Sequence, residues 1–107
     1  MPKLKLVASP TFTATVPIPL AGGEPAPVVM TFRHRTRAQT EAWLNEKGGA
    51  KADTDFVLEM VVGWDLEEPL TKENVELLLQ NYMGAAKAIT DVYLEQLYQA
   101  KLGNSGR

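Results

Sequence analysis

The sequence predicts an α+β fold, mainly helical, in which an N-terminal antiparallel β-hairpin is followed by about four α-helices. Two observations lead to this prediction. Six of the seven prolines precede Arg33, and proline lacks the N–H group that helices and central strands need, so the first third should be extended. After His34 the spacing of the apolar residues lengthens from two to three or four, which is typical of helices.

The hairpin is predicted from alternation on both sides of a turn. Residues 11–18 place apolar side chains at every second position, the pattern of a half-buried strand. The alternation resumes at Val28, Met30 and Phe32, after the turn-forming segment 21–24 with its two glycines. Leu4 and Leu6, flanked by lysines, are expected to add a short edge strand.

The first two helices are expected between residues 36 and 63. Thr36 and Gln39 fit a capping box that begins a helix. This helix should carry Ala42, Trp43 and Leu44 inward and end at Gly48-Gly49. Asp53 or Thr54 should begin a second helix, which Gly63 can end; its apolar face is expected to comprise Phe56, Val57, Met60 and Val61.

Two more helices are expected after a polar loop at 64–70. Thr71 is a good N-cap for a helix with Val75, Leu78 and Leu79 on its apolar side. The segment 81–84 should interrupt it. The last helix is then predicted from about Ala85 to Lys101, with an apolar face of Ala86, Ile89, Tyr93, Leu97 and Ala100.

Length and composition bound the class of protein. A chain of 107 residues should form a single domain, with a hairpin region at 1–33, a helical region at 36–102 and a flexible tail at 103–107. The absence of cysteine excludes disulfides, thiolate metal sites and cysteine nucleophiles. A net charge of −2 argues against a strongly basic nucleic-acid binder. The N-terminus lacks the apolar core of a signal peptide, and the apolar stretches are too short for a membrane span.

Candidate catalytic groups are few. His34 is the only histidine, and two arginines beside it disfavour a bound cation. Asp65, Glu67 and Glu68 offer paired carboxylates but lie in a polar loop, where solvated charge is the better interpretation. Gly22-Gly23 joins two strands and is not a phosphate loop. We therefore expect no enzyme, no catalytic residue, no cofactor and no metal site.

Partner binding is the better-supported interpretation. Arg33, Arg35 and Arg37 form the most basic stretch, which fits either a solvated strand-to-helix junction or a contact with an anion, a nucleic acid or an acidic protein. A small helical domain does not bury every large aromatic side chain, and an exposed remainder would form an adaptable surface. The aromatic candidates for this surface are Trp64, Tyr82, Tyr93 and Tyr98.

At this point the sequence resembles the phage tail assembly chaperones, in order, over about residues 3–104. Its most specific segments are Gly63-Trp64-Asp65 and Tyr82-Met83-Gly84-Ala85-Ala86, with methionine at 83 where many relatives have proline. The other matching segments are Pro10-Thr11-Phe12, Val16-Pro17-Ile18-Pro19, Gly22-Gly23-Glu24, Phe32-Arg33-His34-Arg35-Thr36-Arg37 and Leu70-Thr71-Lys72-Glu73-Asn74-Val75.

The resemblance implies a non-enzymatic adaptor for virion assembly. Such chaperones bind the tape measure protein, keep it soluble and help to recruit tail tube protein around it. They act in the host bacterial cytoplasm and are absent from the mature virion; in many phages a frameshift adds a second domain. Self-association into a homo-oligomer is kept open, and no nucleic-acid or membrane partner is implied. The alternatives are a structural tail or connector subunit of the virion and, third, a small nucleic-acid-binding regulator.

Overall fold

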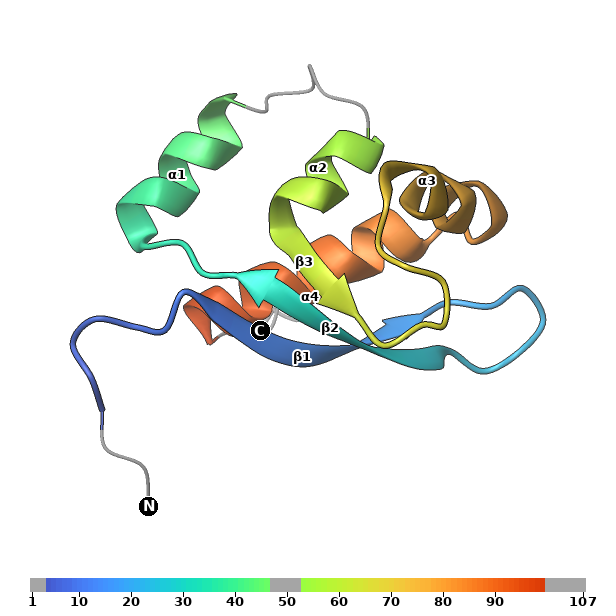
Figure 1. Cartoon of the computed structure of the whole chain (residues 1–107), viewed down its shortest axis with the longest axis horizontal. Helices are drawn as coiled ribbons and strands as arrows, with labels where there is room; N and C mark the ends of the chain where they lie inside the picture. The colour runs from blue at the N-terminus through green and yellow to red at the C-terminus, as the bar shows by residue number, and fades with distance from the viewer. Residues whose placement is uncertain (1–3, 47–52, 100–107) are drawn as a thin grey trace, which may run out of the picture.

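The computed structural model of the protein describes residues 4–46 and 53–99, in which a small sheet packs against helices (Figure 1). The elements in chain order are β1 (Thr11–Ile18), β2 (Ala26–Arg33), α1 (Arg37–Glu46), α2 (Asp53–Met60), β3 (Val61–Trp64), α3 (Lys72–Asn81) and α4 (Ala85–Tyr98). The predicted α+β class, with an N-terminal hairpin followed by four helices in the described residues, is confirmed.

The sheet is antiparallel, with strand order β1-β2-β3, and its two faces differ. The hairpin register pairs Phe12 with Phe32 and Val16 with Val28, so large apolar side chains share one face. The threonines of β1 occupy the opposite face and are exposed to solvent. Helix α4 packs on β1 and passes behind the strands in the view of Figure 1. The alternation seen in the sequence therefore separates the core-facing side chains of the strand from the solvent-facing ones.

The hydrophobic core lies between the inner face of the sheet and the helices. Its largest fully buried side chains include Tyr93 from α4, Phe32 and Met30 from β2, and Met60 from α2. Trp43 of α1 closes one end of this core and stacks on Phe56, with ring centroids 4.7 Å apart. One continuous cluster thus joins the hairpin to the helices.

Two of the predicted helix starts are confirmed by side-chain capping. Thr36 and Gln39 satisfy each other's backbone N–H groups, at 3.1 Å to the threonine hydroxyl and 2.9 Å to the glutamine carbonyl. The Thr71 hydroxyl accepts a hydrogen bond from the Asn74 N–H at 3.1 Å and caps α3. Helix α3 ends at Asn81 and α4 begins at Ala85, as the interruption in the sequence predicted.

The prediction that the second helix continues through Val61 to Gly63 is wrong. Helix α2 ends at Met60, and Val61–Trp64 forms strand β3 beside β2, with Thr31 opposite Gly63 and a bulge after it. The β-branched pair Val61-Val62 suits a strand, and the free edge of β2 supplies its partner. Gly63 therefore lies in a strand, and not at a helix end.

Three smaller predictions also fail. Leu4 and Leu6 form no strand and are 90% and 97% exposed, because two isolated apolar side chains bury too little surface to offset the entropy of ordering the chain. Ala42 faces solvent, and Thr40 is buried beside Trp43 on the inner side of α1 instead. Helix α4 ends at Tyr98, where Gln99 is a left-handed C-cap, and so it stops before the predicted end near Lys101. The predicted helix end at Gly48-Gly49 and the tail at 103–107 lie outside the described residues.

Candidate functional site: an apolar groove

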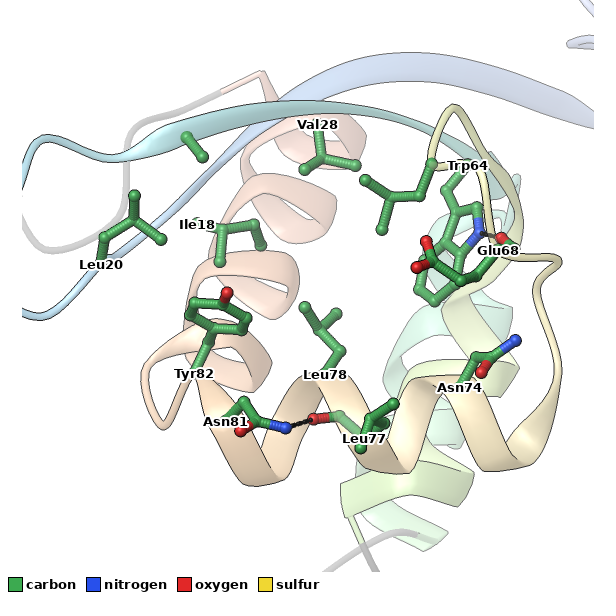
Figure 2. Close-up of a pocket in the computed structure, with 12 residues that line it drawn as sticks. Ile18, Leu20, Val28, Trp64, Glu68, Asn74, Leu77, Leu78, Asn81 and Tyr82 are labelled. Carbon is green, nitrogen blue, oxygen red and sulfur yellow. Dashed lines mark hydrogen bonds between the residues drawn. The ribbon is translucent and has the colours of Figure 1, made fainter.

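A groove of about 380 Å³ opens between the turn end of the hairpin and helix α3 (Figure 2). Leu78 points from α3 toward Ile18 and Val28 on the hairpin, while Trp64 stands at one end and Tyr82 toward the other. The side chains that line it are Ile18, Leu20, Ala26, Val28, Trp64, Leu66, Glu68, Asn74, Leu77, Leu78, Asn81 and Tyr82. The walls are thus mainly apolar, with polar groups at the margin.

The end of the groove near Trp64 is held by hydrogen bonds of the loop after β3. The Trp64 indole N–H donates to the carbonyl of Glu68 at 2.7 Å, which fixes the ring against the loop. Asp65 extends the strand pairing, because its carboxylate accepts from the Val29 N–H and its own N–H donates to the Val29 carbonyl, both at 3.1 Å. Asp65 is therefore a structural group, and its side chain aligns the loop with β2.

The other end of the groove is set by the break between α3 and α4. The Tyr82 N–H donates to the Leu78 carbonyl at 2.9 Å and ends α3. At Gly84 the chain passes so close to the hairpin that a Cβ built there would lie 3.0 Å from Cγ of Pro19. This close approach places the break between α3 and α4 against the hairpin.

Apolar side chains remain exposed around the groove. Leu77 is 59% exposed and Tyr82 is 39% exposed, although both line it. Met83, in the break just beyond Tyr82, is 92% exposed. An isolated exposed apolar residue is ordinary, but several beside one apolar groove are typical of an interaction surface.

The chain around the groove is acidic. Between Trp64 and Tyr82 five side chains are acidic and only Lys72 is basic, and all five acidic side chains (Asp65, Glu67, Glu68, Glu73 and Glu76) are exposed. Lys72 lies 3.8 Å from Asp55 of α2, so its charge is directed away from the groove wall. The surface therefore combines apolar walls with negative surroundings and favours a ligand with positive groups beside apolar ones.

The three candidate arginines do not share one surface. Arg35 is half-buried: its Nη1 donates to the Glu59 carbonyl at 2.9 Å and to the Tyr93 hydroxyl at 2.8 Å. Its guanidinium also lies 4.3 Å from the centre of the Trp43 ring, a cation–π contact. Arg33 and Arg37 are exposed on either side of it. Arg35 thus binds the chain's own helices, which leaves two separate exposed charges.

The four aromatic candidates divide in the same way. Trp64 and Tyr82 line the groove. Tyr93 has no exposed surface, and its hydroxyl donates to the Arg33 carbonyl at 2.8 Å. Burial raises the pKa of Tyr93, and the hydrogen bond from Arg35 partly opposes this rise. Tyr98 is 45% exposed at the end of α4 and is not among the groove residues.

Several groove residues were not foreseen from the sequence. Leu20 comes just after the alternating segment 11–18, so the sequence suggests only a turn residue there. Ile18 and Val28 fit the inward-facing positions of ordinary strands. Leu77 carried a usable signal: it extends the apolar run Leu77-Leu78-Leu79 beyond one face of α3, so one leucine of the three had to face solvent.

Metal and membrane sites find no support in residues 4–46 and 53–99. No three carboxylate or histidine side chains of these segments gather closely enough to hold a metal ion. None of the helices in this part of the chain is long and apolar enough to cross a bilayer.

An open apolar groove with acidic surroundings, on a small α+β fold, is a feature typical of protein-binding modules. The sequence also matches the family model for phage tail assembly chaperones over residues 1–104. Because this match spans nearly the whole chain, the protein belongs to the phage tail assembly chaperone family. No curated protein and no solved structure matches it.

Proposed function

We propose that this chaperone binds segments of the tape measure protein in the groove and helps to recruit tail tube subunits around it. The family supports the assembly role, and the observation that carries the proposal is the open groove between the hairpin and α3. One wall of this groove is helix α3, and the other is the hairpin.

The chemistry of the groove favours an amphipathic helix. Its volume of about 380 Å³ is comparable to that of a small-ligand pocket, and it accepts side chains that project from one face of a helix. Exposed Leu77 and Tyr82 extend the contact area along the margin. The glutamates along α3 and its preceding loop favour a client helix whose apolar face is bordered by lysine or arginine.

A second surface serves the tail tube protein in this proposal. Arg33 and Arg37 are exposed at the β2–α1 junction, on either side of the half-buried Arg35. Arg33 pairs with Thr11 at one end of the hairpin, whereas the groove residues Ile18 and Ala26 pair at the other end. The junction therefore lies far from the groove. A client in the groove therefore leaves this junction open. The chaperone acts in the host cytoplasm and leaves before the virion is complete.

Co-expression with the tape measure protein tests the proposal. The tape measure protein should become soluble and co-elute with the chaperone, and a charge introduced by Leu77→Glu should abolish co-elution while the variant stays folded. Val62→Glu is the matched control, because Val62 is also exposed (42%) but lies outside the groove. A folded wild-type chain that leaves the tape measure protein insoluble and unbound contradicts the proposal. Stoichiometric amounts of the chain in purified virions favour a structural subunit instead.

A further inference from the structure

The segment before β1 is an apolar arm that the rest of the described chain leaves uncovered. Residues 4–10, which we call the arm, are all exposed to solvent. Leu4, Leu6 and Val7 are 90%, 97% and 84% exposed, the most exposed large apolar residues of the described chain apart from Met83. The arm extends away from the sheet and helices in Figure 1. Such exposure of neighbouring apolar side chains is unfavourable in water and marks a segment that buries itself elsewhere.

The arm and the groove are complementary in shape and charge. An extended chain directs Leu4 and Leu6 to one side, about 7 Å apart, with Lys5 between them on the other. The groove has apolar walls and a volume of about 380 Å³, equivalent to roughly a dozen water molecules. Positive Lys5 suits the acidic surroundings formed by Glu68 and its neighbours.

The arm and the groove of one chain lie at opposite ends of the hairpin. The arm joins β1 at Thr11, whereas the groove begins at Ile18, at the other end of an eight-residue strand. This strand spans about 23 Å at roughly 3.3 Å per residue. The seven residues of the arm, fully extended, would only just retrace it, and α3 forms the wall of the groove opposite the hairpin. A neighbouring molecule meets no such constraint.

We propose that the arm of one chaperone docks in the groove of a second copy, with Leu4 and Leu6 between the hairpin and α3. Reciprocal exchange closes after two copies and covers both arms and both grooves, whereas one-way exchange builds a chain of copies. This inference rests on the proposed function in one respect: the groove that receives the tape measure protein is the one the arm fills, so the client displaces the arm.

Cysteine cross-linking tests the contact directly, because the natural chain has no cysteine. A Leu6→Cys chain is mixed with a size-tagged Leu77→Cys chain under mild oxidation, with no tape measure protein present. The proposal expects a mixed disulfide-linked dimer in high yield. A Leu6→Cys chain paired with a Val62→Cys chain, also exposed but outside the groove, is the control. Equal yields from the two pairs would overturn the proposal.

Sedimentation velocity over a range of concentrations supplies the second test. The wild-type chain should exceed the mass of a single chain, and both the arm variant Leu4→Ser/Leu6→Ser and the groove variant Leu77→Glu should sediment as monomers. Mixing these two variants should restore pairs, since one retains its groove and the other its arm. A monomeric wild-type chain, or a mixture that stays monomeric, contradicts arm exchange. Binding of the tape measure protein can persist in either case, so the two proposals fail separately.

Discussion

The guanidinium of Arg35 donates a hydrogen bond to the hydroxyl of Tyr93, 2.8 Å away, across 58 residues of sequence. The same hydroxyl donates to the carbonyl of Arg33, and the same guanidinium covers the Trp43 ring. The β2–α1 junction is thereby tied to the middle of α4. The basic stretch of the sequence thus contributes its central residue to the stability of the fold.

Replacement of Arg35 by alanine should lower the free energy of unfolding by about 2–4 kcal/mol, because two hydrogen bonds and a cation–π contact are lost. Arg35→Lys should recover only part of this loss, since lysine lacks the planar fork. Urea denaturation measures both. Arg37→Ala, at an exposed position two residues on, is the control and should change stability by less than about 0.5 kcal/mol. Equal losses at both positions would contradict the assigned role.

Tyr93 should make stability depend on alkaline pH. Burial raises the pKa of its hydroxyl above the ordinary value of 10.0, so the folded state holds the proton more tightly than the unfolded state. This contribution is fully present below about pH 10 and is lost as the pH rises toward the folded-state pKa. Denaturation curves between pH 8 and about 11 should show a smaller decline in Tyr93→Phe than in the wild type. An unchanged decline refutes the assignment.

Gly84→Ala should destabilise the chain by about 1–2 kcal/mol, because the new methyl group would approach Cγ of Pro19 to 3.0 Å. The added change Pro19→Ala should recover part of the loss. Gly63→Ala is the matched control: its Cβ would meet Thr31 at 3.5 Å, an ordinary contact, and should cost nothing. Thermal melts of the four proteins measure the comparison. If Gly63→Ala lowers the melting temperature more than Gly84→Ala does, the close approach of Gly84 to Pro19 does not account for the stability loss.

Tyr82→Ala should weaken binding of the tape measure protein about tenfold, or roughly 1.4 kcal/mol, because its ring lines the groove and remains accessible. Tyr98 is similarly exposed, at 45% against 39%, but lies outside the groove. Tyr98→Ala should therefore leave the affinity unchanged. Calorimetric titration with solubilised tape measure protein measures the affinity of both variants. A larger loss of affinity in Tyr98→Ala than in Tyr82→Ala would place the binding surface at the C-terminal end of α4 instead.

Features encoded locally in the sequence were predictable. Alternation over 11–18 predicted β1, and Thr36 and Thr71 predicted helix starts, because strand faces and N-caps depend on neighbours within a few residues. Strand β3 was missed because Val61–Trp64 becomes a strand only beside β2, thirty residues earlier in the chain. The spacing of apolar residues within 61–64 does not reveal that the edge of β2 is available for pairing.

The site was less predictable than the fold. Trp64 and Tyr82 were chosen as large aromatics, and both line the groove. The groove itself combines the hairpin end, the loop after β3 and helix α3, and no local pattern reports that these three segments converge. Arg35 was grouped with two neighbours of equal charge, yet its partners Glu59 and Tyr93 lie 24 and 58 residues away.

The two tryptophans of this chain occupy opposite kinds of environment. Trp43 is 5% exposed, stacked on Phe56 and hydrogen-bonded to Glu59, whereas Trp64 stands in the wall of the groove. Their fluorescence can therefore report separately on occupancy of the groove and on unfolding of the chain. With Trp43→Phe, the emission of Trp64 follows the filling and emptying of the groove; with Trp64→Phe, that of Trp43 follows only unfolding. The chain thus contains two intrinsic fluorescent probes: Trp64 for occupancy of the groove and Trp43 for the folded state of the core.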